Sequence, residues 1–160
     1  MKKIIPNLWF DTEAEEAANF YTSIFQDSRI LGVTRYGEAG PGPAGTVLTV
    51  NFELRGQEFV ALNGGPEFTF SEAVSFQVSC ESQGEVDRFW DALSAGGEEG
   101  PCGWLKDKYG LSWQIIPTVL FELIGDPDPQ RSQRAMEAML QMHKIDIDEL
   151  TRAAEQPSTG

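Results

Sequence analysis

Residues 12–25, TEAEEAANFYTSIF, decide the fold, because residues 82–94, SQGEVDRFWDALS, repeat their pattern. Each stretch opens with Thr or Ser and has Glu three positions later, which is the capping box that starts a helix. Apolar residues then recur at helical spacing, and Phe20-Tyr21 in the first stretch corresponds to Phe89-Trp90 in the second. Each stretch therefore predicts a helix with one buried face, and the repeat predicts two copies of one module.

Strand-like runs surround both predicted helices. Residues 4–10 precede the first helix and residues 73–79 precede the second, and both runs favour strands. Three runs follow the first helix and three weaker ones follow the second: Arg29–Tyr36, Thr46–Leu54, Gln57–Asn63, Glu98–Cys102, Trp104–Lys106 and Ser112–Pro117. The order βαβββ thus occurs twice, which predicts an α+β fold with modules at about residues 3–65 and 72–117.

The rest of the chain predicts a helical tail over residues 118–155, with residues 156–160 as a frayed terminus. A short helix near residues 119–124 ends at the Gly and Pro residues of 125–129. A second helix is expected from about Gln130 to His143, and Asp146 or Asp148 is expected to cap a last helix that reaches Ala154. The second helix places Ala135, Met136, Met139 and Leu140 on one face, which either packs on its own domain or joins two subunits.

Composition limits the partners. The 160 residues carry a net charge of −13, and 41% of them are hydrophobic, as in ordinary globular proteins. An acidic surface repels phosphates and anionic lipids, so we expect neither nucleic acid nor a membrane as partner. No apolar run approaches the roughly 20 residues that span a bilayer, and the start of the chain lacks a signal-peptide pattern. Two cysteines, Cys80 and Cys102, form no disulfide framework, so we expect a cytoplasmic protein.

Alternation along the strands predicts one apolar and one polar sheet face. Val74, Phe76 and Val78 are expected beneath the helices. The residues expected on the opposite face include Asn7, Trp9, Asn51, Ser75, Gln77, Ser112 and Gln114. If the two modules curve around a shared cleft, these uncharged groups line it and suit a small organic ligand. A plain solvent-facing sheet surface would alternate in the same way.

Three stretches carry a family resemblance: Phe10-Asp11 with EEAANFY at 15–21, NGGP at 63–66, and Cys102-Gly103-Trp104 with DKYGLSWQIIP at 107–117. They resemble the PhnB-like branch of the vicinal oxygen chelate superfamily, which includes glyoxalase I, extradiol dioxygenases, and fosfomycin and bleomycin resistance proteins. The branch often carries the label 3-demethylubiquinone-9 3-methyltransferase. Residues 138–147, AMLQMHKIDI, are similar to its tail. The resemblance implies paired modules that form a curved mixed sheet with a cleft, as one domain over residues 3–117, in a homodimer.

Enzymes of the superfamily hold a divalent ion in the cleft. The resemblance implies ligand positions at Ile5, Ala61, Ala73 and Gln114, three of which are apolar. A shift of register would substitute Asn7, Asn63, Ser75 or Gln77, which still supply no imidazole or carboxylate. A neutral amide alone does not hold Zn²⁺, Mn²⁺ or Fe²⁺, so we expect no conventional catalytic metal and no cofactor.

Other catalytic patterns are weaker. Cys102 has Lys106 and Lys108 near it in sequence but no histidine, and an incidental cysteine is the simpler interpretation. Residues 40–45, GPGPAG, match the G-x-G-x-x-G pattern, but a strand-like run follows where a dinucleotide site needs a helix. We expect a hairpin loop there, which could act as a lid. Glu53, Glu58 and Asp107 form no carboxylate pair by spacing, and Asp107 is expected to hold the turn before Gly110.

The leading hypothesis is therefore a PhnB-like protein that binds a small organic molecule in a neutral cleft. The expected contacts are Asn7, Trp9, Asn51, Asn63, Gln77, Trp104 and Gln114. A second hypothesis is a lyase, isomerase or dioxygenase with an unconventional metal set around Gln114 and Glu53. The third is the methyltransferase of the family label. Whether the protein is an enzyme stays open at this point.

Overall fold

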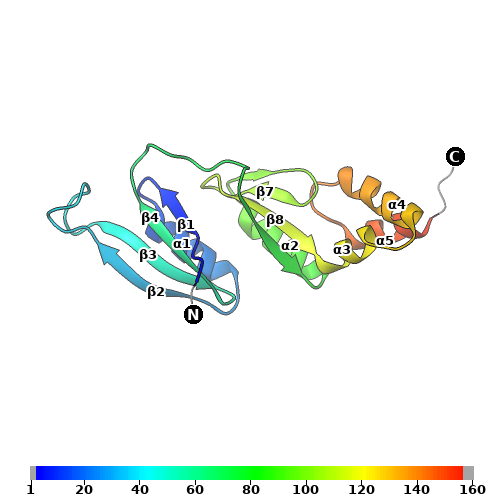
Figure 1. Ribbon diagram of the computed structural model, residues 1–160, viewed down its shortest axis with the longest axis horizontal. Coiled ribbons are helices and arrows are strands. Elements are labelled where there is room, and N and C mark those ends of the chain that lie inside the picture. Colours follow the sequence, from blue (N-terminus) through cyan, green and yellow to red (C-terminus); the bar gives the residue numbers. More distant parts are fainter. Residues whose placement is uncertain (1–2, 157–160) are drawn as a thin grey trace. The chain divides into compact units, whose positions relative to one another are not determined.

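A computed structural model describes residues 3–156, and the remaining residues of the expected frayed terminus, 157–160, lie outside the described part. Contacts within the chain divide it into two compact units, residues 1–70 and 71–160. Each unit holds one four-stranded mixed sheet. The predicted α+β class and the repeated βαβββ order are confirmed (Figure 1).

The N-terminal unit packs one helix on one sheet face. Its elements are β1 (Asn7–Phe10), α1 (Ala14–Ile24), β2 (Ser28–Arg35), β3 (Val47–Leu54) and β4 (Gln57–Asn63). The strand order is β1-β4-β3-β2, with β1 and β4 parallel. Tyr21 of α1 is fully buried and stacks on Phe52 of β3, whose ring stacks in turn on Phe59 of β4. The helical apolar face predicted from the sequence therefore forms the core of this unit.

The C-terminal unit repeats the arrangement. Its first elements are β5 (Ser75–Cys80), α2 (Gln83–Ser94), β6 (Glu98–Glu99), β7 (Trp104–Lys106) and β8 (Ser112–Pro117). The strand order β5-β8-β7-β6, with β5 and β8 parallel, matches that of the first sheet. Phe89 and Trp90 of α2 are buried, as is Trp113 of β8. Val74 was expected in this core, but it precedes β5 and is 63% exposed, because the strand begins only at Ser75.

The two helix starts differ. At α2 the Ser82 hydroxyl accepts from the Glu85 N–H at 3.2 Å, as the capping box predicts. At α1 the predicted box is wrong: the N-cap is Glu13, with no side-chain cap. Instead, the Asn63 Oδ1 at the end of β4 accepts from the Ala14 N–H at 2.8 Å. The sheet thus supplies the cap that the local sequence was expected to provide.

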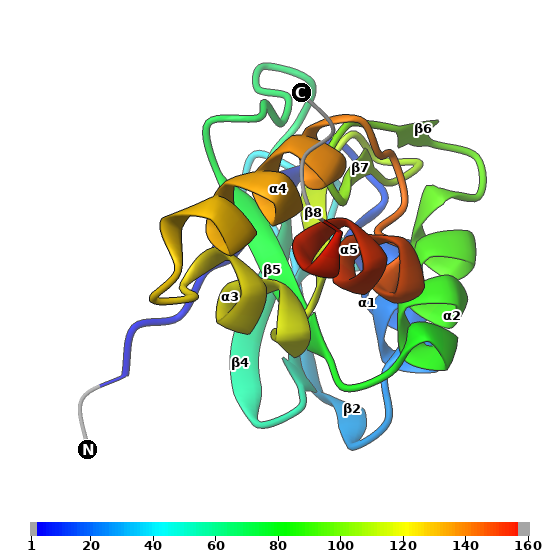
Figure 2. The same ribbon diagram turned by 90° about the vertical axis from the view of Figure 1, so that its right-hand side faces the viewer.

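The tail forms α3 (Thr118–Ile124), α4 (Pro129–Leu140) and α5 (Ile147–Glu155), which contact one another (Figure 2). Asp146 caps α5 by accepting from the Glu149 N–H at 3.0 Å, which confirms one of the two predicted caps. The second tail helix ends at Leu140 rather than His143, and Leu140 is 56% exposed rather than part of the apolar face. Met142 lies beyond the helix and joins a buried cluster.

That buried cluster comprises Ile116, Leu120, Met142, Ile145 and Leu150, with Met139 packed against it. The segment 142–147 is also tied to the second module. The Cys102 N–H donates to the Met142 carbonyl and the Gly103 N–H to the His143 carbonyl, both at 2.8 Å. The side chain of Gln83 bonds to the backbone of residues 145 and 147. Within residues 3–156, no helix is long and apolar enough to cross a membrane.

Candidate functional site

Three of the predicted site residues lie side by side on the C-terminal sheet. Gln77 of β5 pairs in register with Gln114 of β8, which pairs with Trp104 of β7. Register partners on neighbouring strands, about 4.8 Å apart, point to the same face. Leu105 and Trp113 point to the opposite face and are buried. The structure therefore brings together two amides and one indole on the face opposite the buried one.

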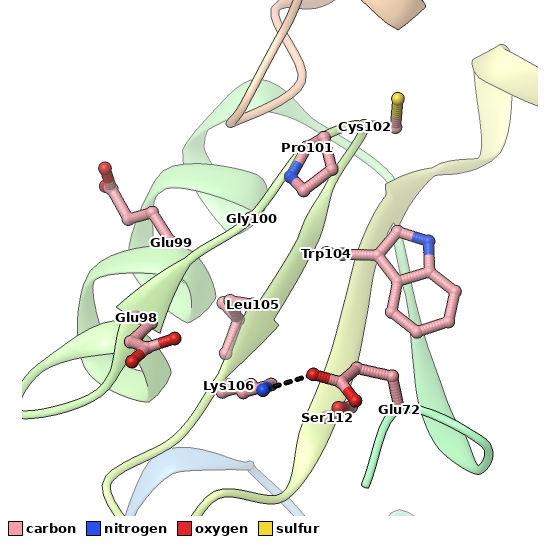
Figure 3. Close-up of a pocket in the computed structure, with 10 residues that line it drawn as sticks. All are labelled: Glu72, Glu98, Glu99, Gly100, Pro101, Cys102, Trp104, Leu105, Lys106 and Ser112. Atoms are coloured by element: carbon pink, nitrogen blue, oxygen red, sulfur yellow. Dashed lines mark ion pairs between the residues drawn. The ribbon is translucent and has the colours of Figure 1, made fainter.

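A second row crosses the same face two residues away. Ser75 of β5, Ser112 of β8, Lys106 of β7 and Glu98 of β6 are successive register partners. A pocket of about 480 Å³ opens beside this row, within the size range of small-molecule sites (Figure 3). Its lining includes Glu72, Glu98, Trp104, Leu105, Lys106 and Ser112. Gln77, Gln114 and Ser75 do not line this pocket, but Gln114 and Ser75 are register partners of residues that do, and Gln77 pairs with Gln114. We treat the pocket and the two adjoining rows as one candidate site on the C-terminal unit.

Ser112 is the unusual member of this site. Ser112 is 1% exposed, and its hydroxyl has no hydrogen-bond partner among residues 3–156. A buried polar group without a partner costs about 1–3 kcal/mol, so such atoms are rare in stable folds. The sequence placed Ser112 on the polar face but gave no sign that it would be buried. A ligand atom in the pocket could supply the missing bond.

The side chain of Gln114 is oriented by Ser75 of the neighbouring strand β5. Its Nε2 donates to the Ser75 hydroxyl at 2.9 Å. This bond fixes the amide plane, because a primary amide has its donors on one side and its acceptor on the other. Within the described residues the Gln114 carbonyl oxygen accepts no bond. The half-buried Gln114 therefore presents an acceptor, and the buried Ser112 a hydroxyl, from the same strand.

An ion pair lies at the edge of the pocket. The Lys106 ammonium contacts the Glu72 carboxylate, and Figure 3 shows both beside Ser112. The hydrogen bond from Lys106 lowers the pKa of Glu72. The same bond and charge raise the pKa of Lys106, and the charge of Glu98 adds to that rise. Both groups are therefore ionised across the neutral range, and both are partly solvent-exposed.

The turn between β7 and β8 is held by Asp107, as predicted. This carboxylate is 2% exposed and accepts from the Tyr109 N–H at 2.9 Å and the Leu111 N–H at 3.1 Å. It also accepts from the Trp113 indole N–H at 2.9 Å, a contact that the sequence reasoning missed. The bonds fix the turn that aligns Lys106 with Ser112. The D-K-Y-G-L-S-W stretch is thus a structural unit beneath the site.

The other four predicted residues lie in the N-terminal unit. Asn7 and Asn51 share a face, because both pair in register with Val60 between them. The Trp9 indole N–H donates to the Gly65 carbonyl at 2.9 Å, and its ring meets Phe68 edge-on. Asn63 lies on the helix side, where its Oδ1 caps α1 and its Nδ2 donates to the Val47 carbonyl. Ligand contacts of these four residues stay a prediction, although both ends of the Asn63 amide already serve the fold.

The G-x-G-x-x-G stretch forms the loop between β2 and β3, as expected for a hairpin connection. The Tyr36 hydroxyl donates to the Asn63 carbonyl at 2.6 Å, and the Tyr36 ring packs against the loop. A Cβ added at Gly42 would lie 2.5 Å from that ring. The glycines therefore allow the loop to pack closely on the Tyr36 ring. Because strand β3 follows the loop, no helix N-terminus is present there to bind a dinucleotide phosphate.

The positions that the resemblance implies for a metal do not fit a divalent ion. Ile5, Ala61 and Ala73 carry no donor atom in their side chains, so only the neutral amide oxygen of Gln114 is left as a ligand at these positions. The Glu53 carboxylate accepts from Arg29 at 3.1 Å. Among residues 3–156, no three His, Cys, Asp or Glu side chains cluster so that they could hold a metal ion. His143 is far from Cys102 in sequence, but its carbonyl accepts a hydrogen bond from the Gly103 N–H and it therefore lies beside the loop that holds Cys102. Sequence spacing could not reveal this proximity.

Comparisons with known proteins bear on residues 2–116, which match a family model described as 3-demethylubiquinone-9 3-methyltransferase. That match ends in β8, before the tail helices. A solved structure described as a putative 3-demethylubiquinone-9 3-methyltransferase, PhnB protein, from Bacillus cereus is 41% identical, with 73% of this chain and 100% of that chain covered and a TM-score of 0.66. A search of curated proteins gives no match.

More distant structures share the fold. Protein PA1353 from Pseudomonas aeruginosa is 19% identical over 73% of this chain and 98% of that chain, with a TM-score of 0.61. The fosfomycin resistance protein FosX from Listeria monocytogenes is 13% identical over 73% of this chain and 93% of that chain, with a TM-score of 0.50. The chain therefore belongs to the PhnB-like family described as 3-demethylubiquinone-9 3-methyltransferase, on the glyoxalase/bleomycin resistance/dioxygenase fold.

Proposed function

We propose that the protein binds a small organic molecule against the C-terminal sheet, without a conventional catalytic metal. The observation that carries the proposal is the buried, unpartnered hydroxyl of Ser112 at a pocket of about 480 Å³. Trp104 offers an aromatic face, and the oriented Gln114 offers an acceptor. Aromatic faces and a few fixed polar groups are what small-molecule sites use for affinity and orientation.

A thermal-shift screen of the full chain against a library of small metabolites tests this proposal. We expect at least one compound to raise the melting temperature, and Gln114→Ala to weaken its binding about tenfold, as expected for loss of a hydrogen bond to a desolvated ligand group. Gln133→Ala is the matched control, because Gln133 is an exposed glutamine of α4 away from the pocket. No stabilising compound, or equal effects of the two variants, would contradict the proposal.

The metal-independent part has its own test. The residues at the implied ligand positions supply one amide and no imidazole or carboxylate, which supports binding through shape and hydrogen bonds. We expect the ligand's affinity to stay unchanged after treatment with a chelator. Stoichiometric Zn, Mn, Ni or Fe in the purified protein, with binding lost on chelation, would instead favour a lyase, isomerase or dioxygenase.

The methyltransferase activity in the family's description can be tested by titration with S-adenosylmethionine. We expect no binding, because the glycine-rich loop is followed by strand β3 and packs on Tyr36. Saturable binding of this cofactor would favour the family's description over our proposal.

A homodimer in the cytoplasm completes the proposed function. Strand β2 lies at the end of its sheet, and Ile30, Leu31 and Val33 on it are 36%, 42% and 41% exposed. An exposed edge strand with apolar side chains is a surface that a second copy can cover. Analytical ultracentrifugation tests this, with a purely monomeric protein as the contrary outcome.

A further inference from the structure

The charges around the pocket are unequal. Its lining contains the carboxylates of Glu72, Glu98 and Glu99 and the single ammonium of Lys106. Glu72 is paired with Lys106, and Glu99 accepts from the Trp90 indole N–H at 2.7 Å. Glu98 makes no hydrogen bond or ion pair with any other residue of the described range 3–156. One exposed carboxylate at the rim is thus left without a bonded partner in a site that is already negative.

The hydroxyl of Ser112 gives an independent sign of a ligand. It is buried and unpartnered, and Figure 3 shows Ser112 beside the Lys106–Glu72 pair. Ser112 and Glu98 are separated by one strand, since both pair in register with Lys106. Two strand spacings place their backbones about 10 Å apart. A ligand group that bonds to Glu98 is thus one strand away from Lys106 and two strands away from Ser112.

Trp104 lies beside the row that joins Ser112 to Glu98. It lies on the same face of β7 as Lys106, two residues away, and its half-buried ring lines the pocket. Pro101 and Cys102 also line the pocket, so its surface beside Trp104 is largely apolar. An indole face attracts both apolar groups and cations. The ligand body that fits here is apolar or aromatic.

We propose that this pocket takes an organic cation, with its ammonium group beside Glu98 and its apolar or aromatic body against Trp104. This inference rests on the proposed binding function and adds the charge class of the ligand. An anion would have to displace Glu72 from Lys106 and then lie between the carboxylates of Glu72 and Glu98. A neutral hydroxyl can donate a hydrogen bond to Glu98 but leaves its charge uncompensated, whereas an ammonium group supplies both the hydrogen bond and the opposite charge.

Three probes of nearly equal shape separate these charge classes. We would titrate the full chain by calorimetry with 2-phenylethylamine, 2-phenylethanol and phenylacetate. We expect the amine to bind about tenfold more tightly than the alcohol, the difference that a charge-assisted hydrogen bond provides, and phenylacetate to bind most weakly. High salt should reduce the preference for the amine, because the carboxylates lie at the surface.

Matched variants locate the effect. Glu98→Gln should bring the affinity for the amine down to that for the alcohol, while Glu122→Gln makes the same change of charge on α3 and should alter neither. Equal affinities for amine and alcohol, tightest binding of phenylacetate, equal effects of the two variants, or no binding of any probe would overturn the cation inference. The metabolite screen decides the proposed function separately, because it contains anions and neutral molecules as well.

Discussion

The two units share one strand order, yet they use their polar side chains differently. In the N-terminal unit, Asn63 caps α1, Trp9 donates to Gly65, and Tyr36 donates to Asn63. In the C-terminal unit, the Ser112 hydroxyl and the Glu98 carboxylate have no bonded partner among the described residues. The comparison shows that polar side chains of the same architecture can form hydrogen bonds within the fold in one copy and remain available for a ligand in the other. We therefore assign the candidate site to the second copy.

The largest effect is expected at Asp107, which is the exception to that contrast because it serves the fold of the C-terminal unit. Asp107→Ala removes a buried carboxylate that accepts from the Tyr109 and Leu111 N–H groups, and it leaves the Trp113 indole N–H without that acceptor. We expect a loss of about 4 kcal/mol in the free energy of unfolding in urea, as several buried donors lose a charged partner. Asp107→Asn keeps one acceptor oxygen and should lose less. A change below about 0.5 kcal/mol for Asp107→Ala would contradict the structural role.

The next effect separates two asparagines of the N-terminal unit. Asn63→Ala removes the cap of α1 and the bond to the Val47 carbonyl, so we expect a loss of about 1–2 kcal/mol in unfolding free energy. Asn51→Ala makes the same chemical change on the opposite sheet face, where no side-chain bond to Asn51 is formed within the described residues. It should cost about 0.5 kcal/mol or less. Equal losses would remove the distinction between fold and ligand face.

Two register partners of the C-terminal unit make a finer test. Ser75→Ala removes the acceptor of the Gln114 amide and should cost about 1 kcal/mol. Ser112→Ala removes a buried hydroxyl without a partner, so stability should stay unchanged or rise by up to about 1 kcal/mol. Urea unfolding of both variants measures the difference. A larger loss for Ser112→Ala than for Ser75→Ala would mean that the hydroxyl is already satisfied.

The smallest effect concerns pH. Hydrogen bonds from Gln83 and then Lys144 lower the pKa of Asp87, which links α2 to the tail. A carboxylate with a lowered pKa stabilises the fold above its ordinary pKa, and that contribution disappears as the pH falls through the lowered value. The stability difference between wild type and Asp87→Asn should therefore be present at neutral pH and vanish in acid. A difference that persists unchanged in acid would exclude this linkage.

Local patterns predicted much of this fold. The bounds of β4, β7 and β8 agree with the predicted runs, because turns at Arg55-Gly56 and Asp107–Gly110 separate them clearly. The cap of α1 escaped prediction because Asn63 reaches it from a distant strand. The Gln77–Gln114–Trp104 row followed from alternation once the register was known. Glu72 and Glu98 were missed as site residues, since only the tertiary fold places a loop carboxylate and an edge strand beside Lys106.

The attachment of the tail has a consequence for how the pocket is built. Pro101 and Cys102 line the pocket, and the Cys102 and Gly103 N–H groups are held by carbonyls of residues 142 and 143. The stretch of homology to the family ends earlier, at residue 116. A protein that ended at residue 116 would lose both of these hydrogen bonds, so the tail supports the rim of the pocket although it lies beyond the matched range.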